Sequence, residues 1–325
     1  MSFSNLNLFA GSGSLSYGLA QSGLVGNTLA IEYDAEALTT LRANRGNFWM
    51  LGKDKDLITV NGDLSINPDK FIYSDRVDML TASLPTKHYT ARSVSTRQQS
   101  IVDTHDISAT LSHVIQCRPK IVYIEALPGL RECNAGNPFR WLLSSLRMQG
   151  YTVISQVINM VHYGVPQHRD RLIILAWEST KIPPLGLHGG FLPLEPISPH
   201  KTLRQALEDV PESIGSKLAP QTAEKFKAVK PGTTYRGQNS SAIYHRLAWD
   251  APTPAMGTTQ DAYCHPDQLR RLTVREVARV QTIPDHYVIT GNLLQQYRLI
   301  GAATPPEFTR QLGLAILKRL TSNLT

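Results

Sequence analysis

The sequence predicts an α/β fold built on a mostly parallel sheet, followed by a second, smaller and loop-rich region. Short apolar segments alternate with amphipathic ones up to Trp177, a pattern typical of parallel strands that are each followed by a covering helix. After Trp177 this alternation stops and Pro and Gly become frequent, as in KIPPLGLHGGFLPLEPISP. The chain has 325 residues, of which 42% are hydrophobic, so it is long enough for one large domain and one smaller one.

The individual elements follow from the apolar pattern: short apolar runs predict strands, and amphipathic segments predict helices. The predicted strands are Asn5–Phe9, Asn27–Ile31, Val77–Thr81, Ile121–Ile124, Thr152–Asn159 and Leu172–Trp177, the last two as a pair. The predicted helices are Leu15–Gln21, Ala35–Ala43, Ile107–Gln116, Pro138–Met148 and Pro306–Leu320. Thr273 is a predicted helix N-cap, because Glu276 follows at the position of a capping box.

The composition favours an anionic partner. Lys and Arg number 33 against 26 Asp and Glu, a formal net charge of +7; this excess suits nucleic acid, although many proteins without such a partner are mildly basic. The three cysteines are too few and too dispersed for a disulfide framework or a zinc site, so we expect a reduced compartment and no metal. No segment resembles a secretory signal or reaches the roughly 18 apolar residues that span a bilayer. We therefore expect a cytoplasmic protein, or a nuclear one in a eukaryotic host, without a membrane partner.

A glycine-rich turn follows the first predicted strand. In NLFAGSGSLSYGL, Gly11 and Gly13 allow a tight turn and a close approach of the backbone to a ligand before the helix begins. Glu32 ends the second strand about 20 residues further on, where a carboxylate can accept hydrogen bonds from both ribose hydroxyls. Asp63 follows the next strand, in NGDLS. These residues predict an adenosine-containing ligand at the carboxyl edge of the sheet; the alternative is an ordinary α/β turn beside a surface glutamate.

Six motifs follow one another along the chain: LFAGSGSLSYGL, SLPTKHYTARS, YIEALPGL, YGVPQHRDRLIILA, HPDQLRRLTVREVARVQTIP and IGAATPPEFTRQLGLAIL. Their order resembles that of the DNA cytosine-C5 methyltransferase family over nearly the whole chain, and the last one resembles the family's GNAVPP helix. The resemblance implies a Rossmann-like, S-adenosylmethionine-dependent methyltransferase fold with a smaller, loop-rich target-recognition domain. It places the large cofactor-binding and catalytic domain at residues 1–177 plus 304–325, and the target-recognition domain with the hinge at residues 178–303.

The resemblance implies S-adenosylmethionine, or its product S-adenosylhomocysteine, as the cofactor. Phe9 takes the family position that stacks on the adenine. The implied cofactor-binding residues are Phe9, Gly11, Gly13, Glu32, Asp63, Pro85 and Ala302.

Thr86 stands after Pro85, at the position where the family carries its nucleophilic cysteine. Family enzymes add the cysteine thiolate to C6 of a cytosine that has been flipped out of the duplex, which makes C5 nucleophilic enough to take the methyl group. A thiol with a pKa of about 8.5 is partly ionised and intrinsically nucleophilic, whereas a threonine hydroxyl needs an adjacent base. We therefore expect standard C5 methylation to be absent or severely impaired.

Other residues of the implied catalytic site are retained. Glu125 matches the family glutamate that hydrogen-bonds the cytosine edge, and Arg169 and Arg171 match the residues that steady the flipped base and brace that glutamate. Without the resemblance, two arginines at a strand entrance would be read as salt-bridge residues. Ala126 and Ala302, in contrast, replace two family asparagines. Cys133 is a candidate substitute nucleophile, but an ordinary loop thiol is the simpler interpretation.

Basic residues are expected to contact double-stranded DNA. Arg92 and Arg97 follow the catalytic loop, in a segment that closes over DNA in the family. Arg236 and Arg246 lie where lysines and arginines alternate with tyrosines, a composition suited to backbone and groove contacts. The alternative for each of them is a solvated polar loop.

The leading hypothesis is a DNA-binding relative of the family that keeps the cofactor site but has lost the standard chemistry, a pseudoenzyme that regulates or assists an active methyltransferase or another protein. The alternative is an active S-adenosylmethionine-dependent transferase that modifies cytosine in DNA or RNA without the thiol. Transfer to an exocyclic amine is a minor variant, because SLPTKHY differs from the [DNS]PP[YFW] loop of amino-methyltransferases. A third hypothesis makes Thr86 an engineered replacement, but Ala126 and Ala302 favour natural divergence.

Overall fold

A computed structural model of the chain describes residues 2–49, 56–61, 77–85, 104–187, 189–236, 243–259 and 262–322. Its centre is a seven-stranded sheet in the order β3-β2-β1-β4-β5-β8-β6. The strands are β1 (Phe3–Leu8), β2 (Val25–Glu32), β3 (Asp56–Asn61), β4 (Met79–Ser83), β5 (Ile121–Ala126), β6 (Thr152–Asn159) and β8 (Asp170–Trp177). Neighbours from β3 to β5 are parallel, whereas β8 is antiparallel to both β5 and β6. The mostly parallel sheet predicted from the sequence is therefore confirmed.

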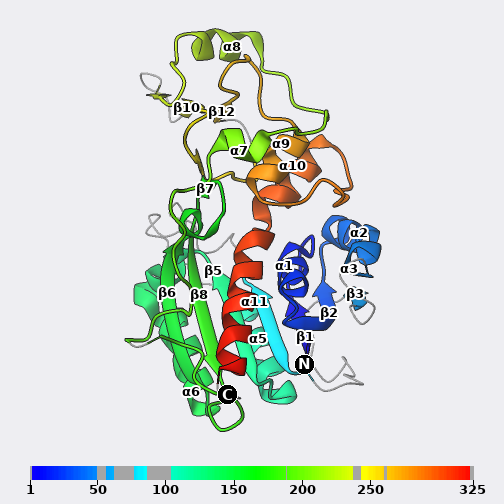
Figure 1. Cartoon of the computed structure of the whole chain (residues 1–325), viewed down its shortest axis with the longest axis vertical. Helices are drawn as coiled ribbons and strands as arrows, with labels where there is room; N and C mark the ends of the chain where they lie inside the picture. Colours follow the sequence, from blue (N-terminus) through cyan, green and yellow to red (C-terminus); the bar gives the residue numbers. More distant parts are fainter. Residues whose placement is uncertain are drawn as a thin grey trace.

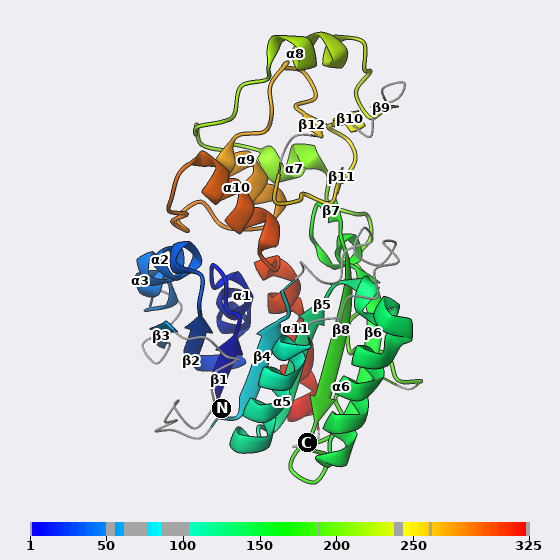
Figure 2. The same cartoon turned by 180° about the vertical axis from the view of Figure 1, so that it is seen from behind.

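Helices cover both faces of this sheet, as the two opposite views in Figures 1 and 2 show. One face packs against α5 (His105–Cys117) and α6 (Asn137–Met148), and the other against α1 (Ser14–Ser22) and α11 (Pro306–Thr321). Because both faces are covered, the central strands are mostly buried, and every residue of β5 is buried, Glu125 included. Two shorter helices, α2 (Ala35–Ala43) and α3 (Arg45–Trp49), follow β2.

The remaining elements lie beyond the carboxyl ends of the parallel strands (Figure 1). The helices are α7 (Leu203–Leu207), α8 (Pro220–Lys227), α9 (Val274–Val280) and α10 (Leu293–Ala302), and the 3₁₀ helices η3 (Pro128–Arg131), η4 (Cys133–Gly136) and η5 (Met160–Tyr163) belong to the sheet's connections. The strands are β7 (Gln167–His168), β9 (Thr234–Arg236), β10 (Ile243–Arg246), β11 (Thr253–Pro254) and β12 (Tyr263–Cys264). The predicted capping box opens α9: Thr273 Oγ1 accepts from the amide of Glu276, whose carboxylate accepts from the amide of Thr273.

One apolar core joins these elements to the large sheet. Tyr17, Leu41 and Phe48 of α1 to α3 belong to the same buried cluster as Val277 of α9 and Ile300 of α10. A separate small cluster forms around Phe226, with Val229 and Cys264. Residues of α7, α9 and α10, in the segment 178–303, therefore share one apolar core with α1 to α3. The domain boundaries given above stay a prediction.

The helices α1 and α11 touch each other at Gly18. A Cβ atom at this position would lie 2.1 Å from the carbonyl oxygen of Pro306 and 2.1 Å from Thr309 Oγ1. Gly18→Ala should therefore lower the free energy of unfolding by about 1–3 kcal/mol through overpacking. Gly46→Ala on α3 is the matched control, because an added Cβ meets nothing within 4 Å there. Urea denaturation followed by circular dichroism measures both variants, and equal losses would contradict the prediction.

Candidate functional site

A cavity of about 400 Å³ opens at the carboxyl ends of β1, β2 and β4, a size typical of small-ligand pockets. Five predicted cofactor residues line it: Phe9, Gly11, Glu32, Pro85 and Ala302. Gly13 lies in the same turn at the start of α1. Asp63 falls outside the described residues. Residues from both ends of the chain, which the sequence assigned to one cofactor site, therefore lie around one cavity.

The glycine-rich turn has a backbone that only a few residue types adopt without strain. Gly11 and Gly13 have φ values of 57° and 85°, in the left-handed region that glycine tolerates. A Cβ at Gly13 would lie 2.3 Å from Leu41 Cδ1, so this position also needs glycine for space. Phe9 itself has φ of 52°, which costs a non-glycine residue on the order of 1–3 kcal/mol. Strain of this kind is common where a backbone is shaped for a ligand.

Glu32 fixes the shape of this turn from the end of β2. Its Oε2 accepts a 2.6 Å hydrogen bond from the amide of Gly11, and Oε1 accepts from the amides of Tyr33 at 2.9 Å and Asp34 at 2.7 Å. Burial raises the carboxyl pKa of Glu32, and these three amides oppose that rise. A carboxylate offers about four acceptor sites, so the side chain can still accept from a ligand hydroxyl.

Two further features fit an adenosine-containing cofactor. Ser12 Oγ is buried in the cavity wall and has no hydrogen-bond partner among the described residues. A buried hydroxyl left without a partner is costly, so a polar ligand group in the cavity would satisfy it. Tyr33, which is 50% exposed, also lines the cavity and offers an aromatic surface beside Glu32. The residues present therefore fit a ligand with ribose hydroxyls and an aromatic base.

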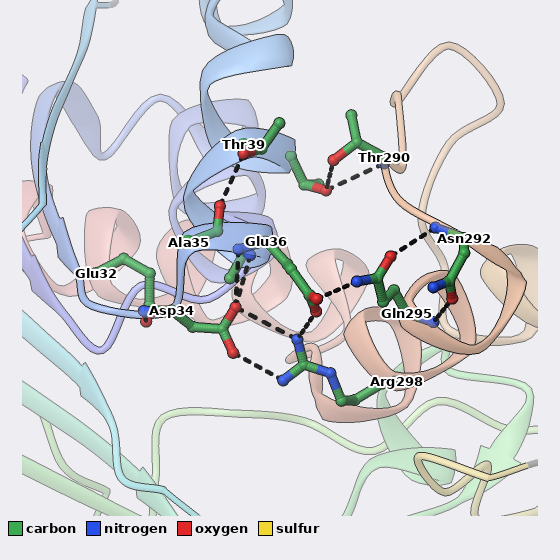
Figure 3. A network of polar contacts seen from close by, with 11 residues as sticks. Glu32, Asp34, Ala35, Glu36, Thr39, Thr290, Asn292, Gln295 and Arg298 are labelled. Atoms are coloured by element: carbon green, nitrogen blue, oxygen red, sulfur yellow. Dashed lines mark hydrogen bonds and ion pairs between the residues drawn. The ribbon is translucent and has the colours of Figure 1, made fainter.

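An ion-pair network ties the mouth of the cavity to α10 (Figure 3). Arg298 donates to Asp34 Oδ2 at 2.8 Å and to Oδ1 at 3.3 Å, and it also pairs with Glu36. Asp34 is the N-cap of α2 and follows Glu32 by two residues. Gln295 donates to Glu36, and Thr40 bonds Thr290 at 2.7 Å. The segment that carries Glu32 is thus held from the far end of the chain.

Glu125 lies at the end of β5 with both carboxylate oxygens engaged. Arg171 Nε donates to Oε1 at 3.0 Å, and Thr304 Oγ1 donates to Oε2 at 2.5 Å. The side chain of Glu125 is only 4% exposed. Burial, and after it the charge of Glu125, raises the pKa of the neighbouring Tyr123. The structure thus brings Glu125 and Arg171 together, as the sequence predicted, and adds Thr304.

Arg169 has a different environment from Arg171. Its guanidinium is fully buried and donates to the carbonyl oxygens of Met256 at 3.0 Å, Gly301 at 2.8 Å and Ala303 at 3.4 Å. Burial, followed by the charge of Arg171, lowers its pKa well below the usual value. Arg169 therefore braces the corner between α10 and α11, and no contact joins it to Glu125 among the described residues.

Gln167 extends this polar junction. Its Nε2 donates to the carbonyl of Val280 at 3.1 Å and to Gln281 Oε1 at 2.5 Å, and its Oε1 accepts from the amide of Met256 at 3.0 Å. Gln281 in turn donates to the carbonyl of Ala303. The QxRxR segment thus connects the large sheet to the end of α9 and, through Arg169, to the corner between α10 and α11.

Among the other predicted residues, the structure describes the contacts of Arg246 and Cys133. Arg246 donates to the carbonyls of Pro266 at 2.7 Å and Val229 at 3.4 Å, and so contributes to the small core. Arg236 ends β9, while Thr86, Arg92 and Arg97 lie outside the described residues. Cys133 Sγ donates to the carbonyl of Leu130 at 3.5 Å, and burial raises its pKa, which disfavours the thiolate form. Its role as a substitute nucleophile therefore has no support in the site.

Several site residues were not identified from the sequence. Thr304 and Arg298 act on Glu125 and Asp34 from far along the chain, and periodicity carries no information about such contacts. Tyr33 could have been found, because it directly follows the acidic residue that ends β2. Ser12 had only its place between the two glycines as a signal.

The fold and the cavity define an α/β protein with an adenosine-type cofactor site at the carboxyl edge of its sheet. The C-5 cytosine-specific DNA methylase family matches residues 3–318, and the chain belongs to this family. The family acts on DNA with S-adenosylmethionine as cofactor. The family membership and the cofactor inferred from the sequence motifs are therefore confirmed.

Individual relatives agree with this assignment. The Type II methyltransferase M.Eco47II of Escherichia coli is 32% identical over a 351-residue alignment, which covers 97% of this chain and 79% of the relative. M.PspPI of Psychrobacter sp. (strain TA137) is 30% identical, over 99% and 80% of the two chains. The fold is shared with Entamoeba histolytica methyltransferase EhMeth (TM-score 0.70, 14% identity, 100% and 99% coverage) and S. pombe Dnmt2 methyltransferase (TM-score 0.68, 17% identity, 100% of both chains).

The described residues contain no helix long and apolar enough to cross a membrane. They also contain no group of three or more His, Cys, Asp and Glu side chains that could hold a metal ion.

Glu32→Gln should weaken binding of S-adenosylhomocysteine. A hydrogen bond to a charged acceptor contributes about 1.5–3 kcal/mol, which corresponds to roughly ten- to hundredfold in affinity. Isothermal titration calorimetry measures the change. Glu224→Gln is the matched control, because Glu224 is an exposed residue of α8 that does not line the cavity. Equal affinities of the two variants would contradict the role given to Glu32.

Arg298→Gln should lower the free energy of unfolding at pH 7 by less than about 1 kcal/mol, because this ion pair is partly exposed. Arg298 lowers the pKa of Asp34 below its ordinary value of 3.8, chiefly by hydrogen bonding. A lowered carboxyl pKa gives stability above the ordinary value and loses it as pH falls through the folded value. The difference from the wild type should therefore be constant above about pH 5 and vanish in more acidic solution. Denaturation curves across this pH range test it, and a pH-independent difference would exclude the ion pair as the cause.

Proposed function

We propose that this chain binds double-stranded DNA and S-adenosylmethionine while its standard cytosine C5 methylation is absent or severely impaired. It acts in this proposal as a regulatory relative or partner of an active methyltransferase. The observation that carries the proposal is Thr86 after Pro85, at the family's nucleophile position. A hydroxyl without an adjacent base remains protonated near neutral pH and attacks an aromatic pyrimidine poorly.

The positions of the three cysteines support this proposal. Cys117 ends α5, Cys133 is buried in η4 and Cys264 is buried in β12. None of them lines the cavity that holds Phe9 and Glu32. Burial raises the pKa of all three thiols, to about 12 for Cys117. A thiolate nucleophile is therefore hard to supply from elsewhere in the chain.

The ligand-holding parts of the site support retained binding. The cofactor cavity keeps its glycine-rich turn and Glu32, and Glu125 keeps Arg171 as a partner. These groups hold ligands by hydrogen bonds and burial, which do not depend on a nucleophile. The related Type II methyltransferases and the family's DNA substrate support DNA as the partner.

A basic surface in the 220–246 segment supports a DNA contact. Lys225, Lys227 and Lys230 lie on or just after α8 and are exposed. Lys225 lies 5.1 Å from the ring centre of Tyr244, and the nearby Tyr235 is 46% exposed. Exposed lysines suit phosphate contacts, and tyrosines beside them suit sugar or base contacts. In this proposal, DNA binds on this side of the elements beyond the sheet, and the target cytosine leaves the duplex toward Glu125.

The retained polar site also favours a second candidate, an active transferase that modifies cytosine in DNA or RNA without a thiol. Glu125 would still bind the base edge, and the cofactor would still offer its methyl group. The two candidates differ in whether any modified nucleoside is formed.

The first test is incubation of the wild-type chain with labelled S-adenosylmethionine and mixed DNA and RNA, followed by mass analysis of nucleosides. We expect 5-methylcytosine to form on the order of a thousandfold or more below the rate of an intact family enzyme, as for loss of a catalytic nucleophile. Thr86→Cys should raise this rate, and Thr86→Cys combined with Glu125→Gln should not. Any other modified base identifies the second candidate, and 5-methylcytosine at an ordinary rate overturns the proposal. No gain from Thr86→Cys would assign part of the defect to Ala126 or Ala302.

A further inference from the structure

The hydroxyl of Thr304 makes a contact that its motif does not predict. In IGAATPP, Thr304 stands where GNAVPP has a valine, which carries no hydrogen-bonding group. Its Oγ1 nevertheless donates to Glu125 Oε2 at 2.5 Å, between residues 179 positions apart in the chain. Thr304 is 3% exposed, so water does not compete for this bond. A short hydrogen bond to a buried carboxylate is among the stronger contacts in a protein.

The backbone around Thr304 is held in place on both sides. Arg169 donates to the carbonyls of Gly301 and Ala303, and Gln281 donates to that of Ala303. Pro305 follows directly and restricts the backbone of the residue before it. The Thr304 hydroxyl therefore approaches Glu125 from a fixed direction.

The two donors bond different oxygens of the Glu125 carboxylate. Arg171 occupies one site on Oε1 and Thr304 occupies one site on Oε2. The terminal torsion of a glutamate has a broad energy minimum, so a single donor leaves the carboxylate plane free to turn. Donors on both oxygens fix that plane, while each oxygen keeps a second acceptor site.

A buried threonine nearby makes no such contact with a carboxylate. Thr309, which is fully buried on α11, donates to the carbonyls of Leu15 and Pro306 at 3.1 Å each. Thr304 lines the cofactor cavity next to Ala302 and Ala303. Thr304 thus lines the cofactor cavity and also bonds the carboxylate of Glu125 at the end of β5.

We propose that Thr304 is a positioning residue that fixes the Glu125 carboxylate plane to receive the exocyclic amine of a flipped cytosine. This inference rests on the proposed function, in which Glu125 binds the base edge. It deepens that function by adding a hydroxyl at a motif position that is otherwise apolar. Ala126 has no side-chain amide that could donate to Glu125, whereas Thr304 supplies a second side-chain donor beside Arg171.

The test measures base preference at equilibrium, which needs no methyl transfer. A duplex is first selected from a randomised pool with the wild-type chain in the presence of S-adenosylhomocysteine. Each cytosine of that duplex is then replaced in turn by 2-pyrimidinone, which lacks the 4-amino group. The ratio of the two dissociation constants at the sensitive position reports the contact to Glu125, and Glu125→Gln gives the ratio without a charged acceptor.

Thr304→Val keeps the shape of the side chain and removes the donor. It should lower the cytosine preference about tenfold, the loss expected for a hydrogen bond to a charged group. Thr304→Ser should retain the preference. Thr304→Ala should lose it as Thr304→Val does, and it serves as a second variant without the donor if Thr304→Val folds poorly. Thr309→Val is the matched control: it removes a buried hydroxyl five residues further on, in α11, and should leave the ratio unchanged.

The outcomes separate the two levels of the proposal. A wild-type preference that survives in both Thr304→Val and Thr304→Ala overturns the role of Thr304 and leaves the proposed function intact. A wild-type chain that binds the selected duplex without any cytosine preference overturns base recognition by Glu125, and with it the role of Thr304. Failure to select any duplex overturns DNA binding itself.

Discussion

The arrangement of the site depends on one buried cation. Arg169 makes no salt bridge with a carboxylate among the described residues; its two terminal nitrogens donate to the carbonyls of Met256, Gly301 and Ala303, and its Nε has no partner there. A charge buried in this way is stable only if its donors are aimed at fixed acceptors. The corner between α10 and α11 must in turn keep the carbonyls of Gly301 and Ala303 directed at Arg169. That corner carries the wall of the cofactor cavity and the hydroxyl that reaches Glu125, so a single guanidinium sets the geometry of both.

The cofactor cavity is consequently a product of both ends of the chain. Its floor comes from the first turn and from the ends of β1, β2 and β4, while Leu299, Ala302 and Thr304 close it from α10 and α11. The shared apolar core between α1 to α3 and α7, α9 and α10 holds the two parts together, and Arg298 adds a partly exposed ion pair at the mouth. A ligand in this cavity contacts both parts at once, so its binding energy and the placement of α10 are coupled.

The sequence predicted the parts of the fold that follow from local apolar patterns. Strand Thr152–Asn159 and helix Ala35–Ala43 have the predicted bounds, and the other predicted elements of the sheet differ only at their ends. Helix α10 was missed, because several of its residues are polar or exposed and its buried positions are recognisable only once α9 packs against it. For the site, the sequence placed Glu32 at the end of a strand and Arg171 at the entrance of another, and β2 and β8 have these residues there; the functional roles of both stay predictions. Motif order could not separate Arg171 from Arg169, since the two arginines differ only in which distant partners the fold brings to them.

The proposed loss of the nucleophile and the proposed retention of ligand binding are compatible on physical grounds. Nucleophilic addition requires one ionisable sulfur at one position, so a single substitution removes it. Binding is distributed over many contacts: three amides shape Glu32, two donors orient Glu125, and the turn at Gly13 is set by packing against Leu41 and Tyr287. Most of these groups also stabilise the fold, because they are buried polar atoms that would be costly to leave unpaired. A family member without its nucleophile would therefore keep the cavity and the buried Glu125 carboxylate as long as it keeps its folded state.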